Sequence, residues 1–189
     1  MKYVKVLGLL AVAAAALMAF AGTASADVAT SPPGTTYTGT ITASAEGHVI
    51  LHNPIWKLEC ASTASGPITS DGVGTPVRGS ISTLDFTNCT NEWHVTTVAG
   101  GTLAANNEGA TTTVTSSGAT VEMTRAGINC RYKTENTKVG TLAGGTTATM
   151  TISAAIPFHS GSFLCGSGAT TWTGSYVVTT PDTLFIDNN

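Results

Sequence analysis

Charge is scarce in this sequence of 189 residues. Asp, Glu, Lys and Arg together make up 10% of it, whereas about 25% is usual for a globular protein. A chain with so little charge is not a disordered polyelectrolyte. The 8 Lys and Arg residues are dispersed and are outnumbered by 11 Asp and Glu residues, for a net charge of -3. This balance argues against a nucleic-acid-binding protein, which needs a basic surface.

Catalytic and metal-binding motifs are also missing. The chain has no nucleophile elbow, zinc-protease helix motif, phosphate-binding loop, dinucleotide-binding glycine pattern or acidic calcium loop. His48 and His52 would share one face of a strand about 13 Å apart, which is too far for one metal ion. We therefore expect no catalytic residue, no metal site and no cofactor. A catalytic triad assembled only in space remains the alternative.

The N-terminus carries the longest apolar run. Lys2 and Lys5 precede the apolar residues 6–20, and Ala-Ser-Ala at 24–26 fits a small-residue cleavage site. This pattern predicts a secretory signal peptide over residues 1–26. The apolar run is shorter than the roughly 20 residues of a membrane span. We expect a secreted, extracellular protein without a membrane span, in which residues 27–34 form a flexible leader and residues 35–189 a single domain.

The four cysteines all follow the predicted cleavage site. An even number in an exported chain predicts two disulfides, and three connectivities are possible. We expect Cys60–Cys89 and Cys130–Cys165, because each pair joins segments that are close in sequence. A zinc site is disfavoured, because the shortest gap between cysteines is 29 residues and no closely spaced pair occurs.

Alternation of apolar and polar residues runs through most of the chain. Ser82, Leu84 and Phe86 share one face of a predicted strand, and apolar residues occupy the alternate positions from 148 to 156. The 35 Thr residues favour strands, and Gly, Asn and Pro separate the strand-like segments at intervals of about ten residues. The sequence predicts an all-β fold, an antiparallel β-sandwich with a barrel as second choice, and almost no helix.

Four segments carry a resemblance to a known group of proteins. They are residues 34–39 (GTTYTG), 81–90 (ISTLDFTNCT), 93–95 (WHV) and 169–178 (ATTWTGSYVV). Together they resemble uncharacterised, exported, Thr- and Gly-rich bacterial proteins with four cysteines, common in actinobacteria. The layout is more distantly similar to small secreted proteins described as activators of alkane oxidation. The resemblance implies structural motifs and brings no catalytic residue with it.

Aromatic residues are few, at 6% of the chain, so the three tryptophans are the main candidates for ligand contacts. Trp56 and Trp93, with the adjacent His94, are the candidate ligand-binding residues. Exposed aromatic rings on a β-sandwich can stack against the apolar face of a sugar. Trp172 alternates with Gly174 and Tyr176 and is expected in the core.

Two uncharged segments, residues 35–43 and 111–116, are candidates for open strand edges. Edges without Lys or other charges can accept a strand from a neighbouring chain. We therefore expect a non-catalytic structural, adhesive or cell-envelope protein that self-associates through such edges or binds a cell-surface glycan. The alternative is a small extracellular module that binds a glycan or an apolar ligand through exposed aromatics.

Overall fold

The computed structural model describes residues 27–69, 76–109 and 111–188, and most of these residues lie in strands. The predicted signal peptide, residues 1–26, lies outside the described residues. Two single-turn 3₁₀ helices interrupt the strands. In chain order the elements are β1 (Asp27–Thr30), β2 (Thr40–Ala45), β3 (Val49–His52), β4 (Lys57–Thr69), β5 (Val77–Ser80), β6 (Thr83–Thr87), η1 (Thr90–Glu92), β7 (His94–Ala99), β8 (Thr102–Asn107), β9 (Thr112–Ser117), β10 (Thr120–Arg125), β11 (Ile128–Lys133), β12 (Thr137–Ala143), β13 (Thr149–Ile156), β14 (Phe158–Gly161), η2 (Phe163–Cys165), β15 (Thr170–Thr180) and β16 (Phe185–Asn188).

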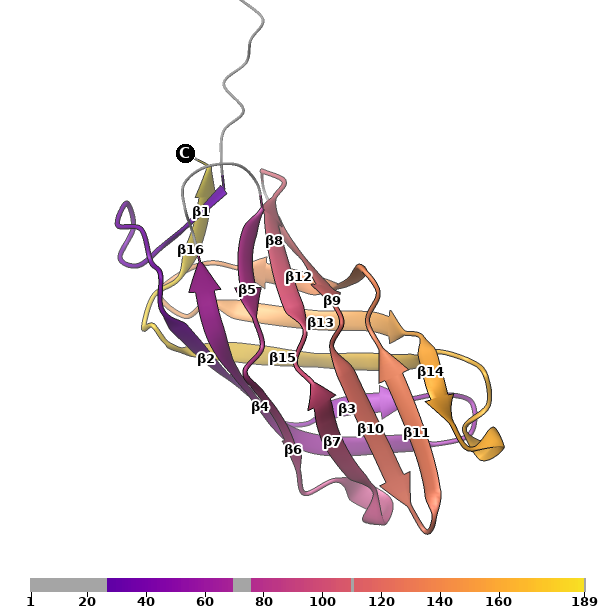
Figure 1. Ribbon diagram of the computed structural model, residues 1–189. Helices are drawn as coiled ribbons and strands as arrows, with labels where there is room; N and C mark the ends of the chain where they lie inside the picture. Colours follow the sequence, from indigo (N-terminus) through magenta and orange to yellow (C-terminus); the bar gives the residue numbers. More distant parts are fainter. Residues whose placement is uncertain (1–26, 70–75, 110, 189) are drawn as a thin grey trace, which may run out of the picture.

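Eight antiparallel strands close into a barrel (Figure 1). In the order β13-β12-β9-β8-β5-β4-β2-β15 each strand pairs with the next. The ring closes because β13 also pairs with β15, from Thr149 opposite Val177 to Ile156 opposite Thr170. The prediction of an all-β antiparallel fold is therefore confirmed. Its second-choice architecture, the barrel, is the one that the central sheet adopts.

A four-stranded sheet, β14-β11-β10-β7, extends beyond one end of the barrel. Barrel strands lead directly into it: β9 continues through Gly118 into β10, and β13 continues through Pro157 into β14. This sheet packs against β3, β6 and the adjoining ends of β4, β13 and β15 through one hydrophobic cluster. We call this region the packed end.

Strand β4 joins the two regions. Its residues 57–60 pair with β3, residues 61–65 pair with β6, and residues 68–69 pair with the barrel strand β5. Gly66 lies where β4 changes partner. A Cβ atom there would lie 1.8 Å from the carbonyl oxygen of Ser80, so this close approach of two backbones requires glycine.

Both disulfides lie in the packed end, with the predicted connectivity. Cys60 on β4 is bonded to Cys89, which follows β6, and Cys130 on β11 is bonded to Cys165 on η2. The expected pairing of neighbouring segments is confirmed. Closing loops of 29 and 35 residues restricts the unfolded chain, and each bond stabilises the fold by roughly 3.5–4 kcal/mol in the chain-entropy description.

The expected flexible leader over residues 27–34 is wrong for its first half. Asp27–Thr30 forms β1, which pairs with Phe185–Asn188 of β16. The apolar residues of this pair, including Ala29 and Ile186, are buried against the barrel. Pro32 and Pro33 suggested a flexible leader. Asp27–Thr30 nevertheless forms a strand, because it pairs with β16, which lies more than 150 residues away in the sequence.

The two expected open edges are also corrected by the structure. Residues 40–44 pair with β4 on one side, and residues 42–45 pair with β15 on the other. Residues 112–117 likewise lie between β8 and β12. Because barrel closure pairs each of these strands on both sides, neither one is free to accept a strand from another molecule.

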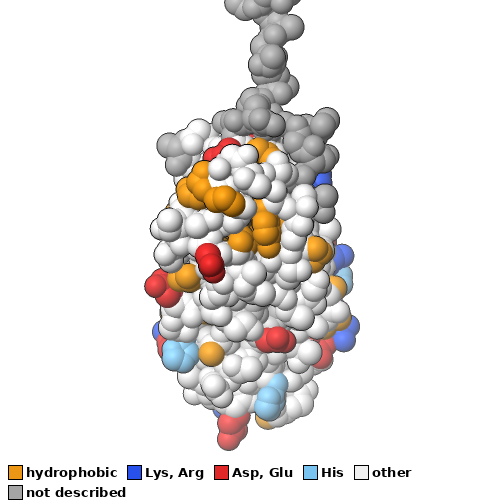
Figure 2. Space-filling view, turned by 90° about the vertical axis from the view of Figure 1, so that its left-hand side faces the viewer, with side chains coloured by type: hydrophobic (Ala, Val, Ile, Leu, Met, Phe, Trp, Pro, Cys, Tyr) orange, Lys and Arg blue, Asp and Glu red, His pale blue; other side chains and the backbone are white. Residues whose placement is uncertain are grey.

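The surface is largely uncharged. In Figure 2 the charged side chains on the visible face are scattered, and hydrophobic side chains gather in its upper part. Charged residues make up only 10% of the sequence.

Candidate functional site

Trp93 and Trp56 belong to the core of the packed end. Trp93 is 5% exposed, and its ring lies 5.5 Å from that of the half-buried Trp56. Asn91 and Glu92 have positive φ values of 59° and 58°, and this tight reversal in η1 directs Trp93 inward. The expected sugar-stacking surface is therefore not formed by Trp93, whose faces are covered by protein.

His94 is placed differently from its neighbour Trp93. It is exposed at the start of β7 and borders an open surface depression together with Glu92, Arg125 and Asn129. The structure therefore separates the three candidate ligand-binding residues. Trp56 and Trp93 pack together inside, and His94 lies outside.

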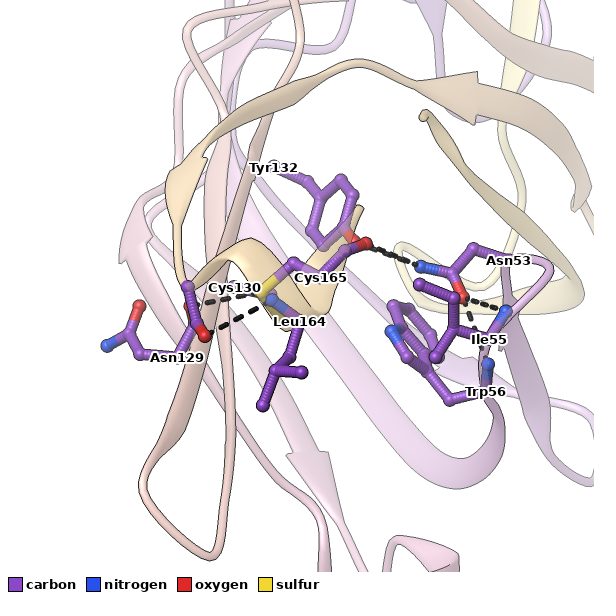
Figure 3. Close-up of a disulfide and its surroundings, with 9 residues drawn as sticks. Asn53, Ile55, Trp56, Asn129, Cys130, Tyr132, Leu164 and Cys165 are labelled. Atoms are coloured by element: carbon purple, nitrogen blue, oxygen red, sulfur yellow. Dashed lines mark hydrogen bonds between the residues drawn. A yellow bond between two sulfur atoms is a disulfide. The ribbon is translucent and has the colours of Figure 1, made fainter. Parts of the chain in front are cut away.

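Asn53 organises the loop that carries Trp56 (Figure 3). Its Oδ1 accepts hydrogen bonds from the backbone amides of Ile55 and Trp56 at 2.9 and 3.0 Å. Its Nδ2 donates to the Tyr132 hydroxyl at 3.2 Å and to the carbonyl oxygen of Cys165 at 3.4 Å. Asn53 is 4% exposed, so this polar network is internal and ties the β3–β4 loop to the second disulfide.

The interior of the barrel is lined mainly by small or aliphatic side chains. Ala43 and Ala64 face each other across β2 and β4, and Ala105 lies between Val77 and Val114 on the neighbouring strands. All five residues line the interior. The three alanines are only half-buried although they face the inside of a closed sheet. Their small side chains leave the interior partly unfilled.

The unfilled interior consists of two adjoining cavities. The first has a volume of about 140 Å³, and the second about 90 Å³. An eight-stranded barrel is just wide enough to be filled by its side chains or to hold one small ligand. Here the side chains do not fill it. Five residues line both cavities: Ala43, Ala64, Ile81, Leu103 and Met150.

Ionisable groups are nearly absent from the lining. Arg78 borders the first cavity, but it is exposed and alternates along β5 with the inward-facing Val77. Tyr176 borders the second cavity, and its hydroxyl donates to Ser62 Oγ at 2.8 Å. Burial raises the pKa of Tyr176 to about 12, against the smaller opposite effect of the Ser62 hydrogen bond. Tyr176 is therefore neutral at ordinary pH.

Most polar groups of the second cavity bind one another. The hydroxyls of Ser116 and Thr134 are 3.0 Å apart and hydrogen-bonded, and Thr134 also accepts from the amide of Ala119. Trp172 lines the same cavity, and its buried indole nitrogen has no hydrogen-bond partner. The lining therefore offers a neutral, apolar environment with few polar groups free to bind a ligand.

The β1–β16 pair borders the first cavity. Leu184 and Ile186 contribute to its lining. The pair is fastened to β8, because the backbone amide of Asn107 donates to Asp27 Oδ2 at 2.9 Å and Asn107 Nδ2 donates to the carbonyl oxygen of Ile186 at 2.8 Å. A third hydrogen bond, from Thr30 Oγ1 to Asp187 Oδ2 at 2.6 Å, joins the two strands to each other. In Figure 1 this pair lies at the end of the molecule opposite the packed end.

The sequence-based search missed the cavity residues because it looked for reactive and aromatic side chains. The available signal was the small size of alternate residues in the strands, such as Ala43 after Ile41 and Ala64 before Gly66. That signal does not by itself separate a hollow barrel from a tightly closed sandwich.

Comparison with known proteins gives no match to a family model, a curated protein or a solved structure. Among the described residues, no group of three or more His, Cys, Asp or Glu side chains is placed to hold a metal ion. Within the same residues, no helix has both the length and the apolar character needed to cross a membrane. Functional inference therefore rests on the geometry of this chain.

Proposed function

We propose that this protein binds a small, uncharged, apolar molecule inside its barrel. The observation that carries the proposal is the aliphatic cavity of about 140 Å³ next to a second cavity of about 90 Å³. An apolar cavity of roughly 150 Å³ in another protein stays dry and binds benzene. The first cavity alone therefore has the volume for a ligand of that size.

The energetics of the empty barrel support this proposal. Side chains that border unfilled space lack van der Waals partners on that side, which lowers the stability of the folded state. Whole domains have an unfolding free energy of only about 5–15 kcal/mol. A ligand that fills the space restores the missing van der Waals contacts and offsets this cost.

The lining also defines the chemical class of ligand. Tyr176 is neutral, and among the described lining residues the one ionised side chain is that of the exposed Arg78. A charged ligand inside the barrel would therefore lose its hydration without gaining a buried counter-charge. A hydrocarbon or another neutral apolar molecule meets no such penalty.

An extracellular location is part of the proposal. The signal-peptide pattern of residues 1–26 supports export, and the two disulfides are compatible with an oxidising compartment. The first expectation, a structural or adhesive protein, receives less support, because residues 42–43 and 112–116 of the two expected open edges are paired on both sides.

Calorimetric titration with benzene tests the proposal, using protein expressed from the full-length sequence. We expect saturable binding with a dissociation constant in the millimolar range or tighter. Ala105→Phe places a ring in the first cavity and should abolish binding. Ala104→Phe, on the outer side of the same strand, is the matched control and should leave binding intact. Absence of binding to the wild type, or equal loss in both variants, would contradict the proposal.

A further inference from the structure

The two cavities share part of their lining. Ala43 and Ala64 contribute only methyl groups to it from opposing positions on β2 and β4. Met150 contributes from β13, where it lies between Leu142 and Tyr176 on the neighbouring strands. Methionine is unbranched and has three rotatable side-chain bonds, so it adapts to irregular spaces at low cost. Met150 is also only half-buried, so its side chain has room to move.

The two cavities follow one another along the strands. On β15, Val178 lines the first cavity and Trp172 lines the second. Six residues of strand separate these positions, which corresponds to about 20 Å. On β9, Val114 lines the first cavity and Ser116 the second. The combined space is therefore elongated.

From this geometry we infer that the ligand is an elongated hydrocarbon that occupies both cavities and passes Met150 with a narrow, unbranched chain. The inference rests on the proposed function and adds the shape and size of the ligand. The first cavity matches a benzene-sized group of about six non-hydrogen atoms. The second is roughly two-thirds as large, so it adds room for about four more.

Alkylbenzenes provide the probes for this inference, because the ring matches the first cavity and the chain can extend into the second. We expect affinity to rise about three- to fourfold with each methylene group from benzene to n-butylbenzene, and to stop rising when the second cavity is filled. The isomer tert-butylbenzene has the same number of atoms but a branched group that cannot pass the boundary. It should bind no more tightly than benzene.

One variant locates the effect within the barrel. Leu84→Phe fills space in the second cavity, which Leu84 lines without reaching the first. It should retain benzene binding and lose the gain from the butyl chain. Thr87→Phe, at an exposed position of the same strand, is the control and should keep that gain.

The outcomes separate this inference from the proposed function. If the wild type does not bind benzene, the proposed function fails and the inference fails with it. If benzene binds but n-butylbenzene binds no better, or tert-butylbenzene binds equally well, only the inference of an elongated ligand is overturned. The same holds if Leu84→Phe retains the full gain.

Discussion

The packed end and the barrel are built from continuous strands, yet their interiors differ. In the packed end, Tyr132, Met123 and Leu58 have no solvent exposure, and the rings of Tyr132 and Phe158 lie 5.8 Å apart. In the barrel, inward-facing residues such as Ala43 and Ala105 are half-buried and border cavities. Since both regions are antiparallel and Thr-rich, the size of the inward-facing side chains is what separates a solid core from a hollow one.

The two regions also differ in covalent cross-linking. Both disulfides lie in the packed end, while the barrel is closed by hydrogen bonds alone. Each disulfide contributes roughly 3.5–4 kcal/mol, which helps to offset the van der Waals contacts that the partly unfilled barrel lacks. A solid, cross-linked region can therefore stabilise a chain whose other region is only partly filled by its side chains.

The largest expected difference comes from the same substitution made in each region. Met123→Ala should lower the unfolding free energy by about 2–5 kcal/mol, because it opens a cavity in a filled core. Met150→Ala should cost less than about 1 kcal/mol, because Met150 already borders empty space. Urea denaturation of both variants measures this. Equal losses would show that the barrel is as tightly packed as the other end.

Tyr176 predicts how stability responds to high pH. Its pKa is raised from 10.0 to about 12 in the folded protein, so its stabilising contribution is complete below pH 10 and is lost as the pH rises through 12. Two pKa units correspond to roughly 3 kcal/mol. Tyr176→Phe should therefore flatten the fall in unfolding free energy between pH 10 and 12.

The matched control for this pH effect is Tyr37→Phe. The Tyr37 hydroxyl donates to the carbonyl oxygen of Thr40 at the surface. Denaturant titrations of both variants across the alkaline range separate the two positions. An unchanged slope in Tyr176→Phe would mean that Tyr176 is not responsible for the alkaline loss of stability.

Asn53 tests whether the packed end depends on internal polar contacts. Asn53→Ala removes the acceptor for two backbone amides and the donor to Tyr132. Leaving such groups unpaired costs about 1–3 kcal/mol. We expect that loss in denaturation experiments, together with a red shift of tryptophan fluorescence as Trp56 becomes hydrated. If Asn53→Ala were as stable as the wild type, water would replace the hydrogen bonds of the Asn53 side chain without cost.

The smallest expected effect comes from adding volume. Ala154→Leu, in the packed core where Ala154 is 5% exposed, should cost about 1–3 kcal/mol through overpacking. Ala105→Leu, in the barrel, should be neutral or slightly stabilising, because the added carbons enter the first cavity. Thermal unfolding of the pair gives the sign of each effect. A destabilised Ala105→Leu variant would argue against open space at that position.

The features that could be predicted from sequence depend on short-range patterns. The pairs Cys60–Cys89 and Cys130–Cys165 follow from spacing, and the buried face of Leu84 and Phe86 follows from alternation. Features that depend on distant pairing could not be predicted. The barrel closes only because β13 pairs with β15. Asp27–Thr30 forms a strand only because it pairs with β16.

The candidate site escaped prediction for related reasons. The inward turn of Trp93 depends on positive φ values at Asn91 and Glu92, which no residue pattern marks. The cavities arise because the inward-facing side chains of the eight barrel strands together do not fill the barrel interior. Each strand taken alone, such as β8 with Leu103 and Ala105, reads as an ordinary half-buried strand.

The most direct test of the hollow barrel is a crystal structure of the protein, expressed from its full-length sequence, under xenon pressure. Xenon enters dry apolar cavities and is easily located by its electron density. We expect xenon within about 4 Å of Val114, Leu142 and Met150, at van der Waals contact, and none in the core around Met123. A barrel interior filled by its own side chains, without xenon, would contradict this account.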